Sequence, residues 1–85
     1  MVETAVMFTT YAIKSKNRNY IYVGITNDID RRLKEHNTGI NKTTKPYKPF
    51  LLLYSKTHDS RVKAREHEKK LKSGSGKEFL KSLVK

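Results

Sequence analysis

The first part of the chain alternates between apolar and polar side chains. From about Val6 to Lys14 the alternation is loose and rich in β-branched and aromatic residues, which is typical of a strand. Residues 15–19 (SKNRN) have turn composition, and residues 20–25 are again rich in Tyr, Ile and Val. The pattern therefore predicts a β-hairpin, in which Gly24 marks a bulge or the close approach of another group.

A spacing of three and four residues replaces the alternation after the hairpin. Ile29, Leu33, His36 and Ile40 follow the capping candidates TND. They predict a helix of about ten residues that ends at Gly39. The next segment, NKTTKPYKP, contains two prolines and three lysines, so it is expected to be a loop and not a central strand.

The second half of the chain begins with a continuous apolar run. Residues 50–58 (FLLLYSKTH) are typical of a buried strand, either the central or the third strand of a sheet. Asp59 or Ser60 is expected to cap a second helix that runs to about Ser73 and stops at Gly74.

A short third helix closes the chain. Ser75 and Glu78 have the Ser-x-x-Glu spacing of a capping box, and the helix that follows holds the apolar residues Phe79, Leu80, Leu83 and Val84. The order of elements is then β-β-α-β-α-α. We expect an α+β fold in which helices flank a three-stranded antiparallel-type sheet, and one domain that spans residues 1–85.

Charge is the strongest signal in the composition. The chain has 19 Lys and Arg against 8 Asp and Glu, a formal net charge of +11. Such an excess favours polyanionic partners, of which nucleic acid is the commonest in a cell. The alternative is that the lysines only keep the protein soluble.

Other functional classes are disfavoured by what the sequence lacks. The chain contains no cysteine, which excludes disulfides and thiolate metal sites and suits a reducing cytosol. The N-terminal residues MVETAVMFTTYAIK include Glu3 and have neither a basic start nor an unbroken apolar run. We therefore expect no signal peptide, no membrane span and a cytoplasmic location.

Helix geometry separates the two arginines of the first predicted helix. At 100° per residue, Arg32 lies at the border of the stripe formed by Leu33 and His36, whereas Arg31 points nearly opposite. Arg32 and His36 are four residues apart, so their side chains can converge on one target. The alternative is that His36 completes the edge of the core while the aliphatic stem of Arg32 covers it.

The second predicted helix places a carboxylate on its apolar face. Glu68 falls between Ala64 and Leu71, whereas Glu66 lies on the opposite side. A carboxylate on a buried stripe needs a compensating positive group. A lysine or arginine ion pair and a hard divalent cation both meet that need.

Tyrosines line the predicted hairpin. Tyr20 and Tyr22 share one face, and Tyr11 lies on the neighbouring strand. Tyrosines in a sheet usually pack with the hydroxyl at the rim. A phenol with its ordinary pKa of about 10 is a poor base, but nearby cations or a metal lower that value.

Together these side chains are candidates for phosphodiester hydrolysis. The reaction needs a proton acceptor for water, a positive group for the extra charge at phosphorus, and neutralisation of the leaving oxygen. The candidates for these parts are Tyr11, Tyr22, Arg32, His36 and Glu68.

The ordered motifs TTY (9–11), YVG (22–24), RRLKEHN (31–37) and AREHEKKLKSGSGKEFLK (64–81) resemble the GIY-YIG nuclease superfamily. The chain is most similar to small stand-alone members related to the N-terminal domain of the C component of excinuclease ABC. The resemblance implies an endonuclease that hydrolyses DNA, in repair or recombination, with one Mg²⁺ or Mn²⁺ ion.

The resemblance also implies roles for single residues. Tyr11 and Tyr22 match the two motif tyrosines, one of which helps to deprotonate the attacking water. Arg32 matches the arginine that contacts the scissile phosphate, and His36 the residue that aids proton transfer or positions the phosphate. Glu68 matches the glutamate that binds the metal ion.

Two groups of lysines are expected to bind nucleic acid through contacts with its phosphates. They are Lys42, Lys45 and Lys48 in the loop and Lys69 and Lys72 on the second helix. Two functional alternatives remain open beside the nuclease. One is a non-catalytic nucleic-acid-binding module on the same scaffold, and the other is a protein-protein adaptor.

Overall fold

A computed structural model describes residues 7–84 of the chain. Its elements are β1 (Phe8–Ser15), β2 (Ile21–Thr26), α1 (Ile29–Thr38), the short 3-10 helix η1 (Lys45–Tyr47), β3 (Phe50–His58), α2 (Arg61–Lys72) and α3 (Gly74–Ser82). The predicted α+β fold and its β-β-α-β-α-α order are confirmed. Val6, the predicted start of the first strand, lies outside the described residues, as does the N-terminal stretch on which the argument against a signal peptide partly rests.

The sheet is antiparallel with the strand order β2-β1-β3. Tyr11 in the central strand β1 pairs with Gly24 in β2 and with Ser55 in β3. The prediction of a buried strand at residues 50–58 was wrong in one respect. β3 is an edge strand whose neighbour within the described sheet is β1, and Leu51 and Leu52 stay 55% and 44% exposed despite their apolar side chains.

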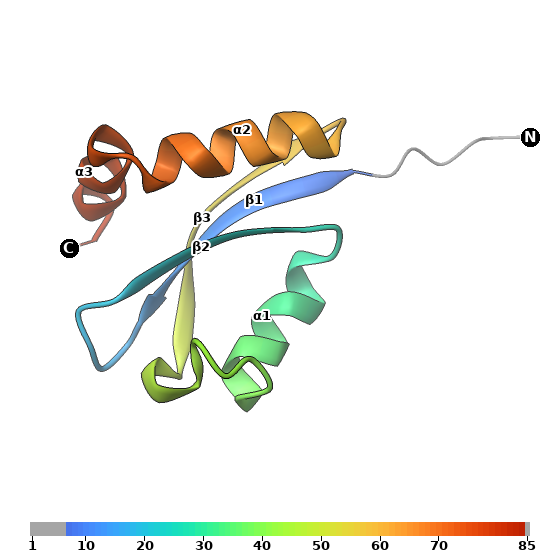
Figure 1. The fold of residues 1–85 in the computed structure, drawn as a ribbon. Helices are drawn as coiled ribbons and strands as arrows, with labels where there is room; N and C mark the ends of the chain where they lie inside the picture. Colours follow the sequence, from blue (N-terminus) through green and yellow to red (C-terminus); the bar gives the residue numbers. More distant parts are fainter. Residues whose placement is uncertain (1–6, 85) are drawn as a thin grey trace, which may run out of the picture.

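Helices cover both faces of the sheet. In Figure 1, α2 runs along one face and α1 lies against the other, with α3 at the end of α2. Alternate residues of β1 serve the two faces, as the two-residue period of a strand requires. Ala12 packs with Leu71 and Leu80 of the C-terminal helices. Tyr11 and Ile13 belong to the second core, on the side of α1.

Local capping explains where α1 begins and ends. The side chain of Asp28 accepts a hydrogen bond from the backbone N–H of Arg31 at 3.1 Å, which satisfies one free donor of the first turn. Gly39 ends the helix with φ of 84°, a left-handed conformation that favours glycine. Ile40 lies beyond this cap and is 70% exposed, so the predicted apolar stripe stops at His36.

The corner between α2 and α3 differs from the prediction. Ser60 caps α2 as one of the two expected candidates, but α3 begins at Gly74 and is capped by Ser73 instead of Ser75. Ser73 closes α2 through its N–H to the Lys70 carbonyl, and its hydroxyl accepts from the N–H of Gly76. A Cβ at Gly76 would collide with the backbone of α2. Glycine therefore permits the helices to meet without a linker.

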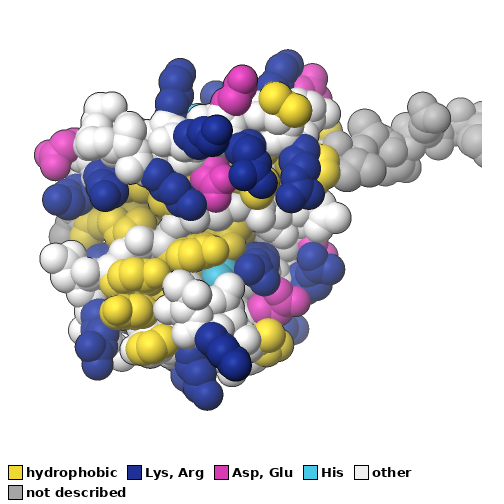
Figure 2. Space-filling model, viewed as in Figure 1, with side chains coloured by type: hydrophobic (Ala, Val, Ile, Leu, Met, Phe, Trp, Pro, Cys, Tyr) yellow, Lys and Arg dark blue, Asp and Glu magenta, His cyan; other side chains and the backbone are white. Residues whose placement is uncertain are grey.

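Lys and Arg side chains are spread over the surface, as the net charge requires (Figure 2). Yellow apolar side chains show between them along the sheet and beside α3. Among residues 7–84, every helix is too short or too polar to cross a lipid bilayer.

Candidate active site

Tyr11 lies at the centre of the candidate site, next to a position of the sheet that has no side chain because it is a glycine. The ring of Tyr11 is buried on the α1 side of β1, opposite Gly24. A Cβ at Gly24 would lie 2.9 Å from the Tyr11 hydroxyl and 3.1 Å from a ring carbon of Tyr22. Gly24 therefore makes room for both rings, whose centroids are 6.3 Å apart.

His36 reaches the Tyr11 hydroxyl from α1. Its Nε2 lies 2.9 Å from that oxygen, and its Nδ1 lies 2.8 Å from Oγ1 of Thr44. The Thr44 hydroxyl lies 3.4 Å from the Asn41 carbonyl, so it can donate to that oxygen and accept from Nδ1–H of His36. This network assigns the tautomer in which Nε2 is free to accept the proton of Tyr11.

Burial keeps both members of this pair uncharged at neutral pH. Burial raises the pKa of Tyr11 to about 12, against the opposing influence of the Arg32 guanidinium, while Tyr22 and Glu68 add to the rise. Burial also lowers the pKa of His36, and the charge of Arg32 lowers it further. The pair is thus a phenol hydrogen-bonded to a neutral imidazole, two groups between which a proton can move.

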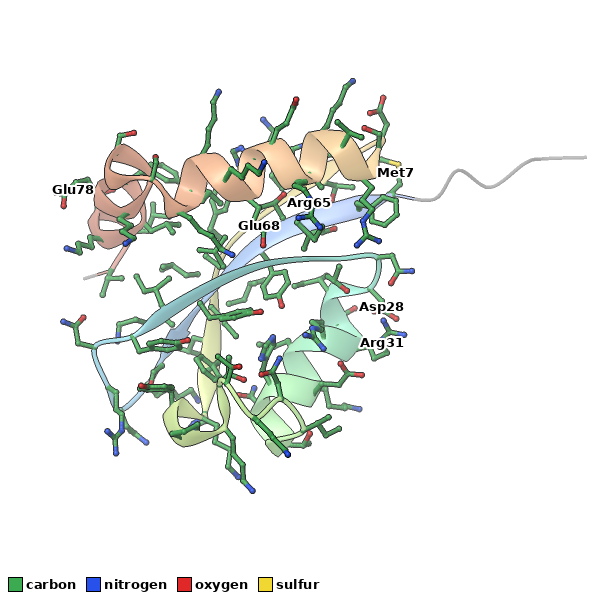
Figure 3. The ribbon with its side chains drawn as sticks, in the orientation of Figure 1. Met7, Asp28, Arg31, Arg65, Glu68 and Glu78 are labelled. Atoms are coloured by element: carbon green, nitrogen blue, oxygen red, sulfur yellow. The ribbon has the colours of Figure 1, made fainter. Side chains whose placement is uncertain are left out.

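Arg32 and Arg31 take the two orientations predicted from helix geometry. The Arg32 side chain is 31% exposed and its Nη1 lies 2.9 Å from Oε1 of Glu35, whereas the Arg31 side chain is 59% exposed. Figure 3 shows Arg31 directed away from the sheet. Burial alone would lower the pKa of Arg32, but Glu35 and Tyr11 outweigh it, and the pKa is raised. Arg32 therefore carries a permanent positive charge beside the Tyr11 hydroxyl.

Glu68 approaches the same region from α2. Its side chain is 16% exposed and lies between the buried residues Ala64 and Leu71, as predicted, while Glu66 is exposed. Figure 3 shows Glu68 extending from α2 toward the sheet. Its charge adds to the raised pKa of Tyr11, after the larger influences of burial, Arg32 and Tyr22. The Glu68 carboxylate also lies 3.2 Å from Nζ of Lys72, the ion pair considered as one alternative.

Glu68 is the carboxylate that α2 contributes to this site, whereas the Glu35 carboxylate of α1 is paired with Arg32. No cluster of three His, Cys, Asp or Glu side chains suited to a metal occurs in residues 7–84. Mg²⁺ commonly binds through one or two carboxylates and completes its shell with water and substrate phosphate. Glu68 fits such a site if its ion pair with Lys72 breaks. The Lys72 side chain is 55% exposed and can turn into solvent.

Three arginines line a pocket beside the site. This pocket has a volume of about 280 Å³ and lies where β2 ends and α1 begins. Its charged lining residues are Arg31, Arg32 and Arg61, with no carboxylate among them. The guanidinium of Arg61 also lies 6.0 Å from the ring centroid of Phe8. Such a pocket suits an anion that accepts several forked hydrogen bonds, as a phosphate does.

The expected lysine groups lie on two separate parts of the surface. Lys42, Lys45 and Lys48 are exposed around η1, and the side chains of Lys45 and Lys48 lie next to Gly39 at the end of α1. Lys69 and Lys72 are exposed on α2. Because the side chains of both groups reach solvent, both are available to a polyanion.

The structure adds two residues that the sequence did not single out. Thr44 is fully buried in the lysine-rich loop, where it holds His36. Asn37 accepts a hydrogen bond from the N–H of Phe50 at 2.6 Å and donates to its carbonyl at 3.4 Å, which fixes α1 to β3. Neither residue has a periodic signal, because each acts through a contact between distant segments.

Comparison with known proteins places this site within a family. The model of the GIY-YIG catalytic domain matches residues 7–81, nearly the whole chain. The chain belongs to the GIY-YIG catalytic domain family, and its relatives include proteins named UPF0213.

Three of these relatives indicate how far the likeness extends. A UPF0213 protein of Vibrio parahaemolyticus is 42% identical over 72% of this chain, but the match spans only 58% of that relative's length. A UPF0213 protein of Staphylococcus haemolyticus is 32% identical over 86% of this chain and 89% of its own length. The solution NMR structure of a UPF0213 protein from Bacillus halodurans is 33% identical, with a TM-score of 0.54 over 92% of this chain and 85% of that one.

Proposed function

We propose that this chain is a metal-dependent endonuclease that hydrolyses phosphodiester bonds in DNA, in repair or recombination. The observation that supports the proposal is the set of side chains around the hydroxyl oxygen of Tyr11. The Tyr11 hydroxyl is hydrogen-bonded to His36, and the charges of Arg32 and Glu68 both act on it. These groups come from β1, α1 and α2, and the family to which the chain belongs is one of catalytic domains.

Phosphate binding is the first step of the proposed mechanism. Arg32 contacts the scissile phosphate, and the pocket that it shares with Arg31 and Arg61 takes the neighbouring phosphate. A guanidinium next to phosphorus stabilises the charge that builds up as water attacks. The lysines around η1 and on α2 hold the rest of the strand without sequence preference.

Proton transfer runs through the phenol and the imidazole. As water attacks phosphorus, its proton passes to the Tyr11 oxygen while the Tyr11 hydrogen passes to Nε2 of His36. Thr44 fixes the tautomer that leaves Nε2 free for this transfer. The imidazolium that forms is beside Arg32, which disfavours it, and near Glu35, which favours it. Tyr22 lines the site from β2 and takes the role of Tyr11 if water approaches from that side.

Glu68 would hold a divalent ion, Mg²⁺ or Mn²⁺, and would leave the remaining ligand positions to water and substrate. A bound ion of this kind neutralises charge on the leaving oxygen. Lys72 competes with the ion for Glu68, because the two side chains are 3.2 Å apart.

Labelled single-stranded, nicked and branched DNA tests the proposal directly. With Mg²⁺ or Mn²⁺ we expect shorter labelled products whose rate of formation rises with enzyme, and no product when a chelator replaces the metal. Products formed equally well in chelator would contradict the proposal, as would intact substrate under every metal tried.

A non-catalytic nucleic-acid-binding module is the second candidate. It is favoured by the ion pair between Glu68 and Lys72, which gives the carboxylate a partner without any metal. This function predicts salt-sensitive DNA binding with no product. Binding that Glu68→Ala leaves intact is common to both candidates, so the appearance of product decides between them.

A further inference from the structure

A groove next to the candidate site has an apolar floor. It lies between β2 and the corner of α2 and α3, and its volume is about 330 Å³. Ile21, Val23, Leu71 and Leu80 form the floor. At about 30 Å³ per water molecule the groove has room for roughly eleven waters. It is therefore large enough for a planar ring system with part of a sugar.

Positive charge borders this floor on the side of α2 and α3. Lys72, Lys77 and Lys81 line the groove, and no carboxylate does. In Figure 2 the yellow side chains beside α3 lie below a row of blue side chains that follow α2 and α3. Lysine stems extend over apolar surface while their ammonium groups stay in water. A ligand that fits has an apolar part to bury and anionic groups on either side of it.

The groove floor lies on the α2 side of the sheet and the Tyr11 ring on the α1 side, and two residues link the groove to the candidate site across the edge strand β2. Tyr22 lines the groove and its ring lies 5.0 Å from the ring of His36. Lys72 lines the groove and pairs with Glu68. The arginine pocket lies at the other end of β2, near Thr26. A six-residue strand is about 17 Å long, so one strand of nucleic acid can follow β2 from the arginines, past Tyr11, to the groove.

We propose that this groove binds the unstacked base of a nucleotide further along the strand from the phosphate held by Arg32, so that the substrate is single-stranded at that nucleotide. The proposal rests on the proposed function for the location of the phosphate. A stacked base in a duplex has both faces covered, whereas a splayed base offers a flat apolar surface and brings its own phosphates to the lysines. Since aliphatic side chains form the floor, the groove accepts any base and gives no sequence preference.

Methyl signals in NMR test the proposal on the unchanged protein, in chelator, so that hydrolysis plays no part. One ligand is octadeoxyadenylate and the other is an abasic strand with eight phosphates. The methyl signals of Ile21, Val23, Leu71 and Leu80 are expected to shift with the adenine strand only. Absence of these shifts overturns the proposal, as do equal shifts with the abasic strand. Shifts caused by anionic phosphatidylglycerol vesicles and not by DNA overturn it in favour of a membrane surface.

A groove-filling variant gives a second, independent test. We expect the wild type to bind the adenine strand about tenfold more tightly than the abasic strand, from the burial of one base. Ile21→Trp is expected to bind the two strands with equal affinity. Leu51→Trp, at an exposed position of β3, is the matched control and is expected to retain the tenfold preference.

Equal binding of both strands by the wild type, or a preference that survives in Ile21→Trp, overturns the groove proposal. Neither result concerns hydrolysis. If the methyl shifts occur but no DNA is cleaved with any metal, the endonuclease proposal fails and the base-binding groove stands. If DNA is cleaved but the methyl signals stay in place, the reverse holds.

Discussion

The hydroxyl of Tyr11 and Nε2 of His36 lie 2.9 Å apart inside the protein, and both side chains are almost completely buried. The same protein contains a second pair of this kind, since the Tyr54 hydroxyl lies 2.8 Å from Nε2 of His67. That second pair is on β3 and α2, away from Gly24 and α1. One pair thus serves as an internal reference for the other.

Tyr11→Phe removes the hydroxyl of the first pair and keeps its ring. We expect a loss of about 1–3 kcal/mol in the free energy of unfolding, because the buried Nε2 of His36 loses its partner. Tyr54→Phe is expected to cost about 1 kcal/mol by the same physics at a more exposed position. Only Tyr11→Phe is expected to lower the cleavage rate, because Tyr54 lies outside the candidate site. Urea denaturation and the DNA cleavage assay measure the two effects, and equal activity losses in both variants would contradict the role given to Tyr11.

Gly24→Ala tests the space that the sheet leaves for Tyr11. The added Cβ would lie 2.9 Å from the Tyr11 hydroxyl and 3.0 Å from its Cζ, so the ring has to shift. Overpacking of this kind lowers the free energy of unfolding by about 1–3 kcal/mol. We also expect a lower cleavage rate, because the shifted Tyr11 ring no longer holds its hydroxyl in place. Gly74→Ala is the control, because a Cβ there meets nothing within 4 Å. Thermal unfolding and cleavage rates of the two variants test this expectation. An unchanged cleavage rate in Gly24→Ala would be evidence against a tightly packed site.

Arg32→Ala is expected to lower kcat/KM by about 100- to 1000-fold, the usual effect of removing one group that stabilises transition-state charge. Arg31→Ala is the matched neighbour. It lines the same arginine pocket but points more into solvent, so we expect it to weaken binding with little effect on kcat. Steady-state kinetics on one DNA substrate separates these effects. Identical profiles for the two variants would refute the assignment of Arg32 to the scissile phosphate.

Glu68→Gln keeps the size of the side chain and removes its charge. We expect cleavage to drop by at least about 100-fold, since several kcal/mol of charge stabilisation depends on the bound ion. DNA binding in chelator is expected to stay equal or to tighten, because a negative charge is lost and Lys72 is released. Glu66→Gln, on the exposed side of α2, is the control and is expected to cleave normally. Wild-type cleavage by Glu68→Gln would exclude Glu68 as the metal ligand.

Acid is expected to destabilise the protein through its buried histidines. Burial and Arg32 lower the pKa of His36 in the folded chain, whereas the unfolded chain titrates near the ordinary value of about 6.5. The unfolded chain therefore binds the proton first as the pH falls. The contribution of His36 to stability is complete above about pH 6.5 and is lost as the pH drops toward its folded value.

Urea midpoints measured from about pH 8 down to about pH 5 check this expectation. The pKa of His67 is also lowered, by burial and by the nearby charges of His58, Lys56 and Lys70. In His67→Gln, the loss of stability that remains on acidification is expected to come from His36. A midpoint that is constant over this range in His67→Gln would contradict the neutral, buried state assigned to His36.

Periodicity predicted most of the fold. The 100° period of α1 separated Arg32 from Arg31, and that of α2 separated Glu68 from Glu66, since both distinctions depend only on position within one helix. The exposure of Leu51 was missed because an apolar run gives no information on which strands pair with it. Whether a strand is central or at an edge depends on the whole sheet.

The contacts among the candidate site residues were not predictable from the sequence. The hydrogen bond between Tyr11 and His36 joins residues that are 25 positions apart, and Thr44 lies in a loop without any periodic pattern. Ser73 was not recognised as the cap of α3 because Ser75 and Glu78 imitate a capping box. The close approach of Gly76 to α2 determines that α3 begins after Ser73. This approach is a tertiary contact, which the local sequence does not reveal.

The corner at Ser73, where α3 follows α2 without a linker, fixes the position of α3 relative to α2. Glu68 lies on α2 and Lys77 and Lys81 lie on α3, and no flexible segment separates the two helices. The corner therefore sets how far the α3 lysines lie from Glu68. An insertion between Ser73 and Gly76 would carry Lys77, Leu80 and Lys81 away from the groove floor while Glu68 keeps its place, so the proposed base binding would weaken and the proposed metal site would stay intact.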